Sequence, residues 1–248
     1  MRAQPYGVLI IHGFASSLDS VKEIKVPLES MGILTRIPTL RGHGQKSPEA
    51  LRGVHWHDWV ADAEVALQSL LAEVERVIIV GHSMGGLIAL TLAADHEDSV
   101  DSIVLAAAAV QLASPLAHGR PLHFLVPLIL RLFTKWPLPP IYADRELAKY
   151  DTNYHWAPMD SITSFLEFAE VTSCRLQEVK VPTFIIQSRK DTTVLPKSAE
   201  IIYNSISTPV EQKRIMWLEL TDHEMFRDCE KNIIVGAIEN YVRERSKQ

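Results

Sequence analysis

Residues that would indicate a disulfide framework or a thiolate metal site are scarce in this sequence. Its 248 residues include only two cysteines, Cys174 and Cys229, too few for either kind of structure. This scarcity favours a reducing compartment, and we expect the chain to be cytoplasmic. The N-terminal region offers only a five-residue apolar run at residues 7–11. That run is too short for a signal peptide or a membrane span, so we expect no integral membrane segment.

Positive charge in excess is also absent. The chain has 25 Lys and Arg against 30 Asp and Glu, a net charge of -5, which gives no electrostatic reason to expect a nucleic acid or an anionic membrane as partner. There is no G-x-G-x-x-G and no Walker motif, so neither a dinucleotide nor a nucleoside triphosphate is indicated. His55 and His57 have no third metal ligand near them in the sequence. We therefore expect a helix cap at His55 and a surface residue at His57, and not a metal-binding pair. We therefore expect no metal and no cofactor, and a small uncharged ligand as partner.

Apolar residues, by contrast, are plentiful. At 47% hydrophobic and 22% charged, the chain can form one full core. Six short runs rich in Val, Ile and Leu predict strands buried on both faces of a mainly parallel sheet: residues 7–11, 33–37, 76–80, 100–105, 182–187 and 214–218. Amphipathic segments lie between several of them, the clearest over residues 56–74. The alternation predicts an α/β fold, a sheet of about six strands flanked by helices.

About 70 residues separate the fourth and fifth of these strands, far more than a crossover needs. This stretch contains the almost wholly apolar LHFLVPLILRLF, then WPLPP, then a second helical pattern near residues 161–176. We predict a small helical cap over residues 110–177, inserted after the fourth strand, with residues 1–109 and 178–248 forming the core domain. Leu125 and Ile129 are expected to contact substrate and the cap to make weak lipid contact, although ordinary packing explains these side chains equally well.

A G-x-S-x-G pattern follows the third predicted strand. The strand RVIIV runs into GHSMGG, which places Gly81, Ser83 and Gly85 in the pattern, and the helical LIALTLAADH follows. A sharp strand-to-helix turn projects the serine hydroxyl at the helix N-terminus, and small residues on either side let neighbouring backbones pass closely. The pattern alone is weak. Its position between a strand and a helix predicts that Ser83 is a nucleophile.

A serine nucleophile needs an imidazole to accept its proton and a carboxylate to orient that imidazole. In this arrangement the order along the chain is serine, acid, histidine. Of ten histidines, only His223 lies beyond the last strand-terminal carboxylate. Asp191, a few residues after the fifth strand, is the predicted acid, the alternative being a solvated loop charge beside Arg189 and Lys190. The neighbouring Asp222 is expected to be a turn residue or a solvated charge, because adjacent loop side chains usually point apart.

Acyl transfer also requires fixed backbone N–H donors for the oxyanion. We expect one from Met84, immediately after the nucleophile, and one from Phe14, in the loop IIHGFASS after the first strand. The Phe14 side chain is expected to contact substrate as well. His12 is interpreted as a residue that braces this loop. For His43, in TLRGHG, we expect that the side chain stabilises a turn. The alternative is that it lies at the rim of the active site.

These stretches together resemble the small bacterial carboxylesterases related to the thermophilic Geobacillus carboxylesterase, and their neighbours, the bacterial monoacylglycerol lipases. The resemblance rests on LIIHGF, PTLRGHG, WHDWVADAE, VGHSMGG, VPTFIIQSRKD and AEIIYNSISTPVEQKRIMWLEL with the histidine loop that follows. It implies the α/β-hydrolase fold, Ser83, Asp191 and His223 as the triad, and Phe14 and Met84 as oxyanion donors. In the histidine loop, TDHE replaces the small residue that often precedes the histidine, so we expect Asp222 to narrow the alcohol side of the site or to shift its preferred pH.

The resulting prediction is a serine carboxylesterase that hydrolyses short- to medium-chain acyl esters through an acyl-enzyme. A monoacylglycerol lipase is the first alternative, favoured by the apolar cap. A non-catalytic ligand-binding receptor on the hydrolase fold is an alternative from another class, against which the complete triad argues. An amide, thioester or carbon-carbon hydrolase also stays open, because the same triad serves each of these reactions. The expected partner is a small ester or a monoacylglycerol.

Overall fold

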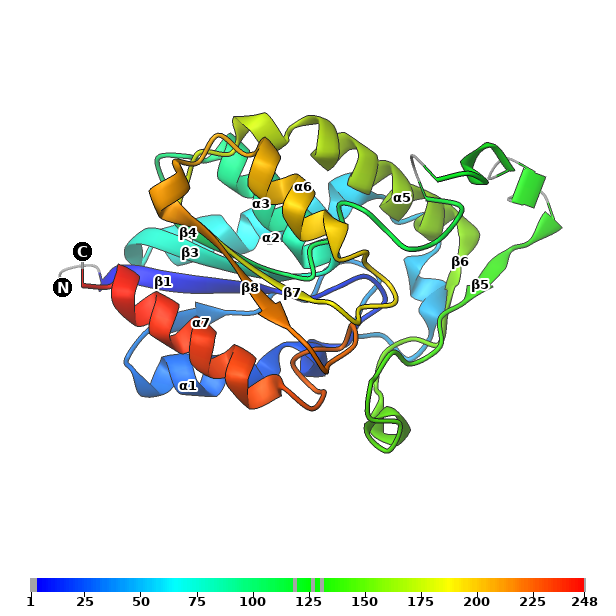
Figure 1. Ribbon diagram of the computed structural model, residues 1–248, viewed down its shortest axis with the longest axis horizontal. Coiled ribbons are helices and arrows are strands. Elements are labelled where there is room, and N and C mark those ends of the chain that lie inside the picture. Colours follow the sequence, from blue (N-terminus) through cyan, green and yellow to red (C-terminus); the bar gives the residue numbers. More distant parts are fainter. Residues whose placement is uncertain (1–3, 118–119, 126–127, 130–131, 248) are drawn as a thin grey trace.

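The computed structural model describes residues 4–117, 120–125, 128–129 and 132–247, and its centre is a six-stranded sheet (Figure 1). The strand order is β2-β1-β3-β4-β7-β8, and every neighbouring pair is parallel. The strands are β1 (Gln4–Ile11), β2 (Leu34–Arg36), β3 (Val74–His82), β4 (Val100–Ala106), β7 (Thr183–Ser188) and β8 (Lys213–Leu218). Each contains or overlaps one of the six apolar runs, so the predicted parallel sheet is confirmed.

Helices cover both faces of this sheet, which explains why its central strands are apolar throughout. On one face α1 (Lys25–Ser30) and α7 (Lys231–Arg245) pack side by side, and on the other lie α2 (Trp56–Leu71), α3 (Met84–Asp95) and α6 (Lys197–Ser205) (Figure 1). All seven residues of β4 are buried. The two apolar cores on either side of the sheet fix the ends of the strands, where the loops of the candidate site begin.

Helix α2 shows how the sequence pattern becomes packing. Its buried face consists of Trp59, Ala63, Leu67 and Leu70, residues spaced three and four apart as a core-facing helical stripe requires. The helix begins after His55, the N-cap residue, whose backbone N–H donates to the Asp58 carboxylate at 2.9 Å. The predictions of a core helix here and of His55 as a cap are confirmed.

In the segment inserted between β4 and β7, the helical pattern predicted near residues 161–176 is confirmed, and a small sheet that was not predicted accompanies it. The segment contains a two-stranded antiparallel sheet, β5 (Lys135–Pro137) with β6 (Trp156–Pro158), and one long helix, α5 (Met159–Cys174). Proline cannot continue a helix, and it is tolerated at the ends of short edge strands, so the WPLPP stretch turns away from a helix into β5. The predicted helix over LHFLVPLILRLF lies partly outside the described residues; of those that are described, His123–Leu125 form a 3-10 turn and residues 128–129 and 132 are helical. The boundaries at 110 and 177 stay a prediction.

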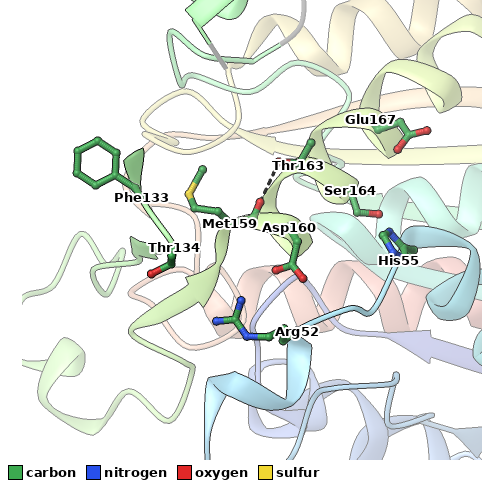
Figure 2. Close-up of a pocket in the computed structure, with 9 residues that line it drawn as sticks. All are labelled: Arg52, His55, Phe133, Thr134, Met159, Asp160, Thr163, Ser164 and Glu167. Carbon is green, nitrogen blue, oxygen red and sulfur yellow. Dashed lines mark hydrogen bonds between the residues drawn. The ribbon is translucent and has the colours of Figure 1, made fainter. Parts of the chain in front are cut away.

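The start of α5 is tied to the core by hydrogen bonds to the segment before α2. The Asp160 carboxylate accepts from the Gly53 N–H and the Ser164 hydroxyl from the Trp56 N–H, each at 2.8 Å. An open cavity of about 450 Å³ lies here, lined by Arg52 among others (Figure 2). Several of its polar groups already serve the fold, since Asp160 and Ser164 make the bonds above and Arg52 pairs with Glu49. Among the described helices, none combines the length and the apolar character needed to cross a bilayer.

Candidate active site

Ser83 occupies the turn between β3 and α3, and its backbone is strained there. Its φ of 55° and ψ of -114° fall outside the regions that non-glycine residues favour, a conformation that costs on the order of 1–3 kcal/mol and that surrounding structure must impose. The Ser83 N–H donates to the Ala106 carbonyl at 2.9 Å and its carbonyl accepts from Ala109 at 3.2 Å. The end of β4 therefore holds the turn in place from both sides, as a sharp strand-to-helix turn requires.

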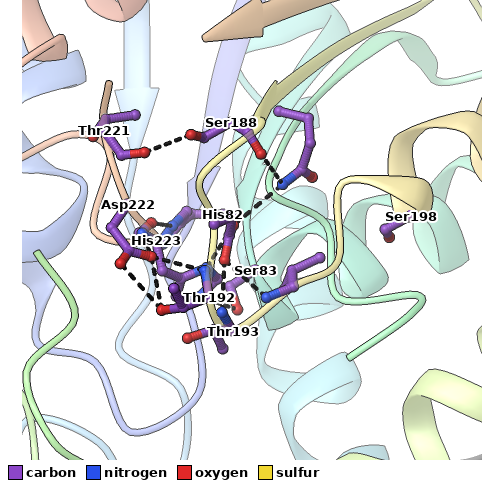
Figure 3. A network of polar contacts seen from close by, with 12 residues as sticks. His82, Ser83, Ser188, Thr192, Thr193, Ser198, Thr221, Asp222 and His223 are labelled. Carbon is purple, nitrogen blue, oxygen red and sulfur yellow. Dashed lines mark hydrogen bonds and ion pairs between the residues drawn. The ribbon is translucent and has the colours of Figure 1, made fainter. Parts of the chain in front are cut away.

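Three side chains from three loops meet at this turn, and Figure 3 shows two of them, Ser83 and His223, side by side. The Ser83 Oγ lies 3.0 Å from His223 Nε2, and His223 Nδ1 lies 3.0 Å from Asp191 Oδ2. Asp191 follows β7 and His223 follows β8, so the parallel order of the sheet delivers all three to the same edge. Ser83 is 5% exposed and the other two are 6% exposed. The chain order serine, acid, histidine thus becomes one continuous line of hydrogen bonds.

The electrostatics of this line are set by burial and by the Asp191 charge. Burial raises the pKa of Asp191, but the His223 charge and N–H groups of Val194 and Thr193 outweigh it, so the pKa lies below its ordinary value. Burial lowers the pKa of His223, and the Asp191 carboxylate more than offsets it, so the pKa of the imidazole lies above 6.5. Asp191 is therefore ionised at neutral pH and stabilises a proton on His223, the arrangement a general base needs.

Asp222 joins the two loops that carry the acid and the histidine. Its Oδ1 accepts hydrogen bonds from the Thr192 N–H at 2.9 Å, the Thr192 hydroxyl at 3.0 Å and the His223 N–H at 2.8 Å. Asp222 therefore has a structural role in its loop, as the interpretation of a turn residue implies. The contacts add that its carboxylate connects the loop of Thr192 to the loop of His223. Asp222 is not among the residues that line the cavity at Ser83, so it does not narrow that cavity directly.

Three further residues hold the histidine loop, and the sequence reasoning did not identify them. His82 donates from Nε2 to the His223 carbonyl at 3.0 Å, and burial lowers the pKa of His82 to about 3, which keeps it neutral. The Asp228 carboxylate accepts from the Asp222 N–H at 2.9 Å and from the Ala143 N–H of the inserted segment at 2.7 Å. Glu230 accepts from Leu220 and Thr221. The only sequence signal was the density of acidic residues in TDHEMFRDCE.

The two predicted oxyanion donors lie in suitable places. Met84 is the first residue of α3, where backbone N–H groups lack helical acceptors. Phe14 lies in the loop after β1, and among the described residues none accepts a hydrogen bond from the Phe14 or the Met84 N–H. The loop is braced by His43, whose Nε2 accepts from the Ala15 N–H at 2.9 Å, and by His12, whose ring contacts the His43 ring. His12 braces the loop as the sequence indicated, whereas His43, expected to stabilise its own turn, contacts both the Arg41 carbonyl of that turn and the loop after β1.

Two adjoining cavities share part of their lining, and one of them opens beside Ser83. One, of about 230 Å³, is lined by Ser83, His223 and Glu224, and the other, of about 320 Å³, by mainly apolar side chains. Both are lined by Phe14 and Phe165, whose rings stack at 5.0 Å. Of the other residues expected to contact substrate, Ile129 lines the apolar cavity, whereas Leu125 lines neither. Leu125 lies in the 3-10 turn His123–Leu125, and its predicted contact with substrate finds no support in the two cavities.

Metal and cofactor sites were not expected from the sequence. Among the described residues, no cluster of three or more His, Cys, Asp or Glu side chains has the arrangement of a metal site. A hydroxyl, an imidazole and a carboxylate in line, next to two unpaired N–H groups, are the components of nucleophilic acyl transfer.

Sequence comparison identifies a family and two curated relatives that match most of this chain. The family model described as serine aminopeptidase, S33, matches residues 5–230. The thermostable monoacylglycerol lipase of Bacillus sp. (strain H-257) is 28% identical over 237 residues, 93% of this chain and 88% of that protein. The carboxylesterase of Bacillus subtilis (strain 168) is 24% identical over 230 residues, 92% of this chain and 88% of that protein.

Solved structures agree on the architecture. A structure from work on the metagenome-derived lipolytic enzymes LipS and LipT superposes with a TM-score of 0.87 at 26% identity, over 98% of this chain and 95% of that one. The monoacylglycerol lipase of Paleococcus ferrophilus superposes with a TM-score of 0.77 at 17% identity, over 98% of this chain and 96% of that one. At that low identity the second likeness shows the fold alone.

Proposed function

Since the chain belongs to the serine aminopeptidase S33 family of α/β hydrolases, we propose that it is a serine carboxylic ester hydrolase with Ser83 as nucleophile. The observation that carries the proposal is the line of two 3.0 Å contacts from Ser83 Oγ through His223 to Asp191. The two Bacillus relatives are named as a monoacylglycerol lipase and a carboxylesterase, which favours an ester over the other acyl compounds that the same three side chains can cleave.

In the proposed cycle, His223 takes the proton of Ser83 as the serine oxygen attacks the ester carbonyl carbon. The tetrahedral oxyanion is held by the N–H groups of Phe14 and Met84, which need no reorganisation when the charge develops. His223 then gives its proton to the departing alcohol, leaving an acyl-enzyme. Water, activated by the same imidazole, attacks the acyl carbon, and the acid is released as Ser83 regains its proton.

The pH dependence of kcat/KM follows, because only the neutral imidazole can accept the serine proton. With the pKa of His223 above 6.5, kcat/KM should rise with pH and reach half its maximum above pH 6.5. Asp191→Asn removes the carboxylate that raises this pKa, so the rise should move to lower pH while kcat falls by roughly 10⁴-fold. Profiles measured with one ester check this, with Asp98→Asn, an exposed aspartate, as the control. An unshifted rise in Asp191→Asn would contradict the assignment of the base.

The acyl chain is assigned to the apolar cavity, which has the lining a hydrocarbon requires. Its walls include Leu112, Ile129 and Ile162 in addition to the stacked Phe14 and Phe165. Each buried methylene contributes about 0.8 kcal/mol, so an acyl chain that fills the cavity binds better than acetate. We propose short- to medium-chain esters as substrates. Monoacylglycerols remain the second candidate, favoured by the relative of that name and by this same apolar lining.

A panel of p-nitrophenyl esters from acetate to laurate tests this assignment. For the wild type, kcat/KM should increase with chain length by up to roughly fourfold per methylene until the cavity is filled. Ile162→Trp, which adds bulk to the wall on α5, should move the preferred chain to a shorter one and leave acetate turnover almost unchanged. Val65→Trp, at an exposed position on α2, is the control. A chain-length profile that Ile162→Trp does not alter would remove this cavity from the proposal.

Weak lipid contact and a cytoplasmic setting belong to the same proposal. Four apolar side chains of the inserted segment are largely exposed, Phe124, Leu128, Leu132 and Phe133, and Ile129 of the same stretch lines the apolar cavity. Large apolar side chains grouped on a surface mark places where apolar ligands or assemblies are met. This arrangement supports brief contact with a lipid particle from which a monoacylglycerol could enter.

A further inference from the structure

The smaller cavity is the place for the leaving group of the ester. His223 must deliver its proton to the departing oxygen, so the leaving group must lie against the imidazole. The cavity of about 230 Å³ touches both Ser83 and His223, whereas these two residues do not line the larger apolar cavity. This placement rests on the proposed function. The polar side chains of the smaller cavity are therefore the ones that can contact the leaving group.

Glu224 is one of the polar side chains of this cavity that the proposed catalytic cycle leaves unused. It follows His223 in the chain, lines the cavity and is only 8% exposed. Its carboxyl group accepts a hydrogen bond from the Asn153 side chain, but its Oε2 has no partner among the described residues. A buried acceptor without a donor is unfavourable by about 1–3 kcal/mol, and by more when it is charged. Natural proteins retain such a group where it meets a ligand or a water molecule.

The charges around the cavity point to the kind of ligand. Among the described residues that line it, two are carboxylates, Glu224 and Asp151, and none is a lysine or an arginine. Asp151 is already occupied, since it accepts from the Tyr142 hydroxyl at 3.1 Å and pairs with Arg227 at 3.3 Å. Among the described residues no ion pair joins Glu224 to a lysine or an arginine, although the nearby charges of His223 and Arg227 act to lower its pKa. The unmet requirement is therefore a hydrogen-bond donor supplied by the molecule that enters.

We propose that Glu224 determines leaving-group specificity by accepting a hydrogen bond from a hydroxyl or a protonated amine on the alcohol part of the ester. The donor must lie a few bonds from the ester oxygen, because Glu224 and the histidine that protonates this oxygen line the same cavity of about 230 Å³. Burial raises the pKa of Glu224, and a donor from the substrate favours the carboxylate form again. Aromatic walls from Trp136 and Tyr154 suit the carbon atoms of such an alcohol and the face of a cation.

Two pairs of butanoate esters with matched shapes test the proposal. The 2-hydroxyethyl ester is compared with the propyl ester, and the 2-(dimethylamino)ethyl ester with the 3-methylbutyl ester, because each pair differs mainly in the donor. In the wild type, kcat/KM for at least one donor ester should exceed that of its partner by roughly tenfold or more, as a hydrogen bond to a charged group provides. The pair that shows the preference identifies the donor as hydroxyl, ammonium or both.

Variants at Glu224 assign the preference to this side chain. Glu224→Leu should bring both ratios close to one. Glu224→Gln keeps an acceptor but no charge, so it should abolish the ammonium preference and retain much of a hydroxyl preference. Glu75→Gln, an exposed glutamate at the opposite end of β3 from Ser83, should leave both ratios as in the wild type.

Several results would overturn the proposal. Equal kcat/KM values within both pairs in the wild type would do so, as would a preference that persists in Glu224→Leu. A purely structural role for Glu224 would lower all four activities together and leave the ratios unchanged, which also contradicts it. If Glu224→Leu does not fold, the ammonium ratio of the isosteric Glu224→Gln decides. A wild type that cleaves none of the four esters would instead refute the proposed function.

Discussion

Ser83→Ala is expected to lower kcat for ester hydrolysis by roughly 10⁴- to 10⁶-fold, the range found when a serine nucleophile is removed from such a triad. The hydroxyl oxygen is the atom that becomes acylated, so no neighbouring group can replace it. What remains is the stabilisation that the Phe14 and Met84 N–H groups give to a carbonyl attacked by water. His223→Ala should have a similar effect, because the two residues act as a unit and their losses do not add.

Labelling with a fluorophosphonate probe gives an independent measurement. The wild type should form one adduct, on Ser83, and Ser83→Ala should form none. Ser69→Ala, at an exposed position on α2, is the matched control for both labelling and turnover. Near-normal turnover of Ser83→Ala would refute the assignment of the nucleophile. A wild type that neither labels nor hydrolyses esters would favour the alternative of a ligand-binding receptor.

The elements that fix this arrangement could be predicted because they leave local signals. A parallel strand buried on both faces is a continuous apolar run, and the six runs predicted the six strands of the sheet. The position of Ser83 follows from a strand, a G-x-S-x-G pattern and a helix in immediate succession. Asp191 and His223 follow from their order after two strands. In each case the information lies within about ten residues or in the order of the chain.

The contacts that hold the histidine loop leave no such signal. Asp228 binds the Ala143 N–H across 85 residues of sequence, and His82 binds the His223 carbonyl across 141. Neither partner can be found without the path of the chain in space. The small sheet of the inserted segment could not be predicted for a related reason: β5 and β6 have three residues each, and only their pairing defines them. Glu224 likewise becomes informative only when the cavity and its unpartnered oxygen are seen together.

Gly85→Ala is the second change with a large expected effect, because it tests why the pattern around Ser83 requires small residues. A Cβ at Gly85 would lie 2.2 Å from the Ile11 carbonyl oxygen and 2.8 Å from the His12 carbonyl oxygen. Both atoms are backbone, and β1 is paired on both sides within the sheet, so the helix must move instead. We expect the free energy of unfolding to fall by about 1–3 kcal/mol or more, as overpacking does.

The same shift should damage catalysis beyond the loss of stability. Moving α3 away from β1 separates the Met84 N–H from the Phe14 N–H, and a displacement of about 1 Å can reduce turnover by roughly 10²-fold. Urea unfolding and kcat/KM on one ester, measured where the variant is still folded, distinguish the two effects. The control is Gly236→Ala in α7, where a Cβ meets nothing within 4 Å and alanine should stabilise the helix by about 0.5–1 kcal/mol. If Gly85→Ala matched the wild type in both measurements, the close approach of α3 to β1 would not be what positions Ser83.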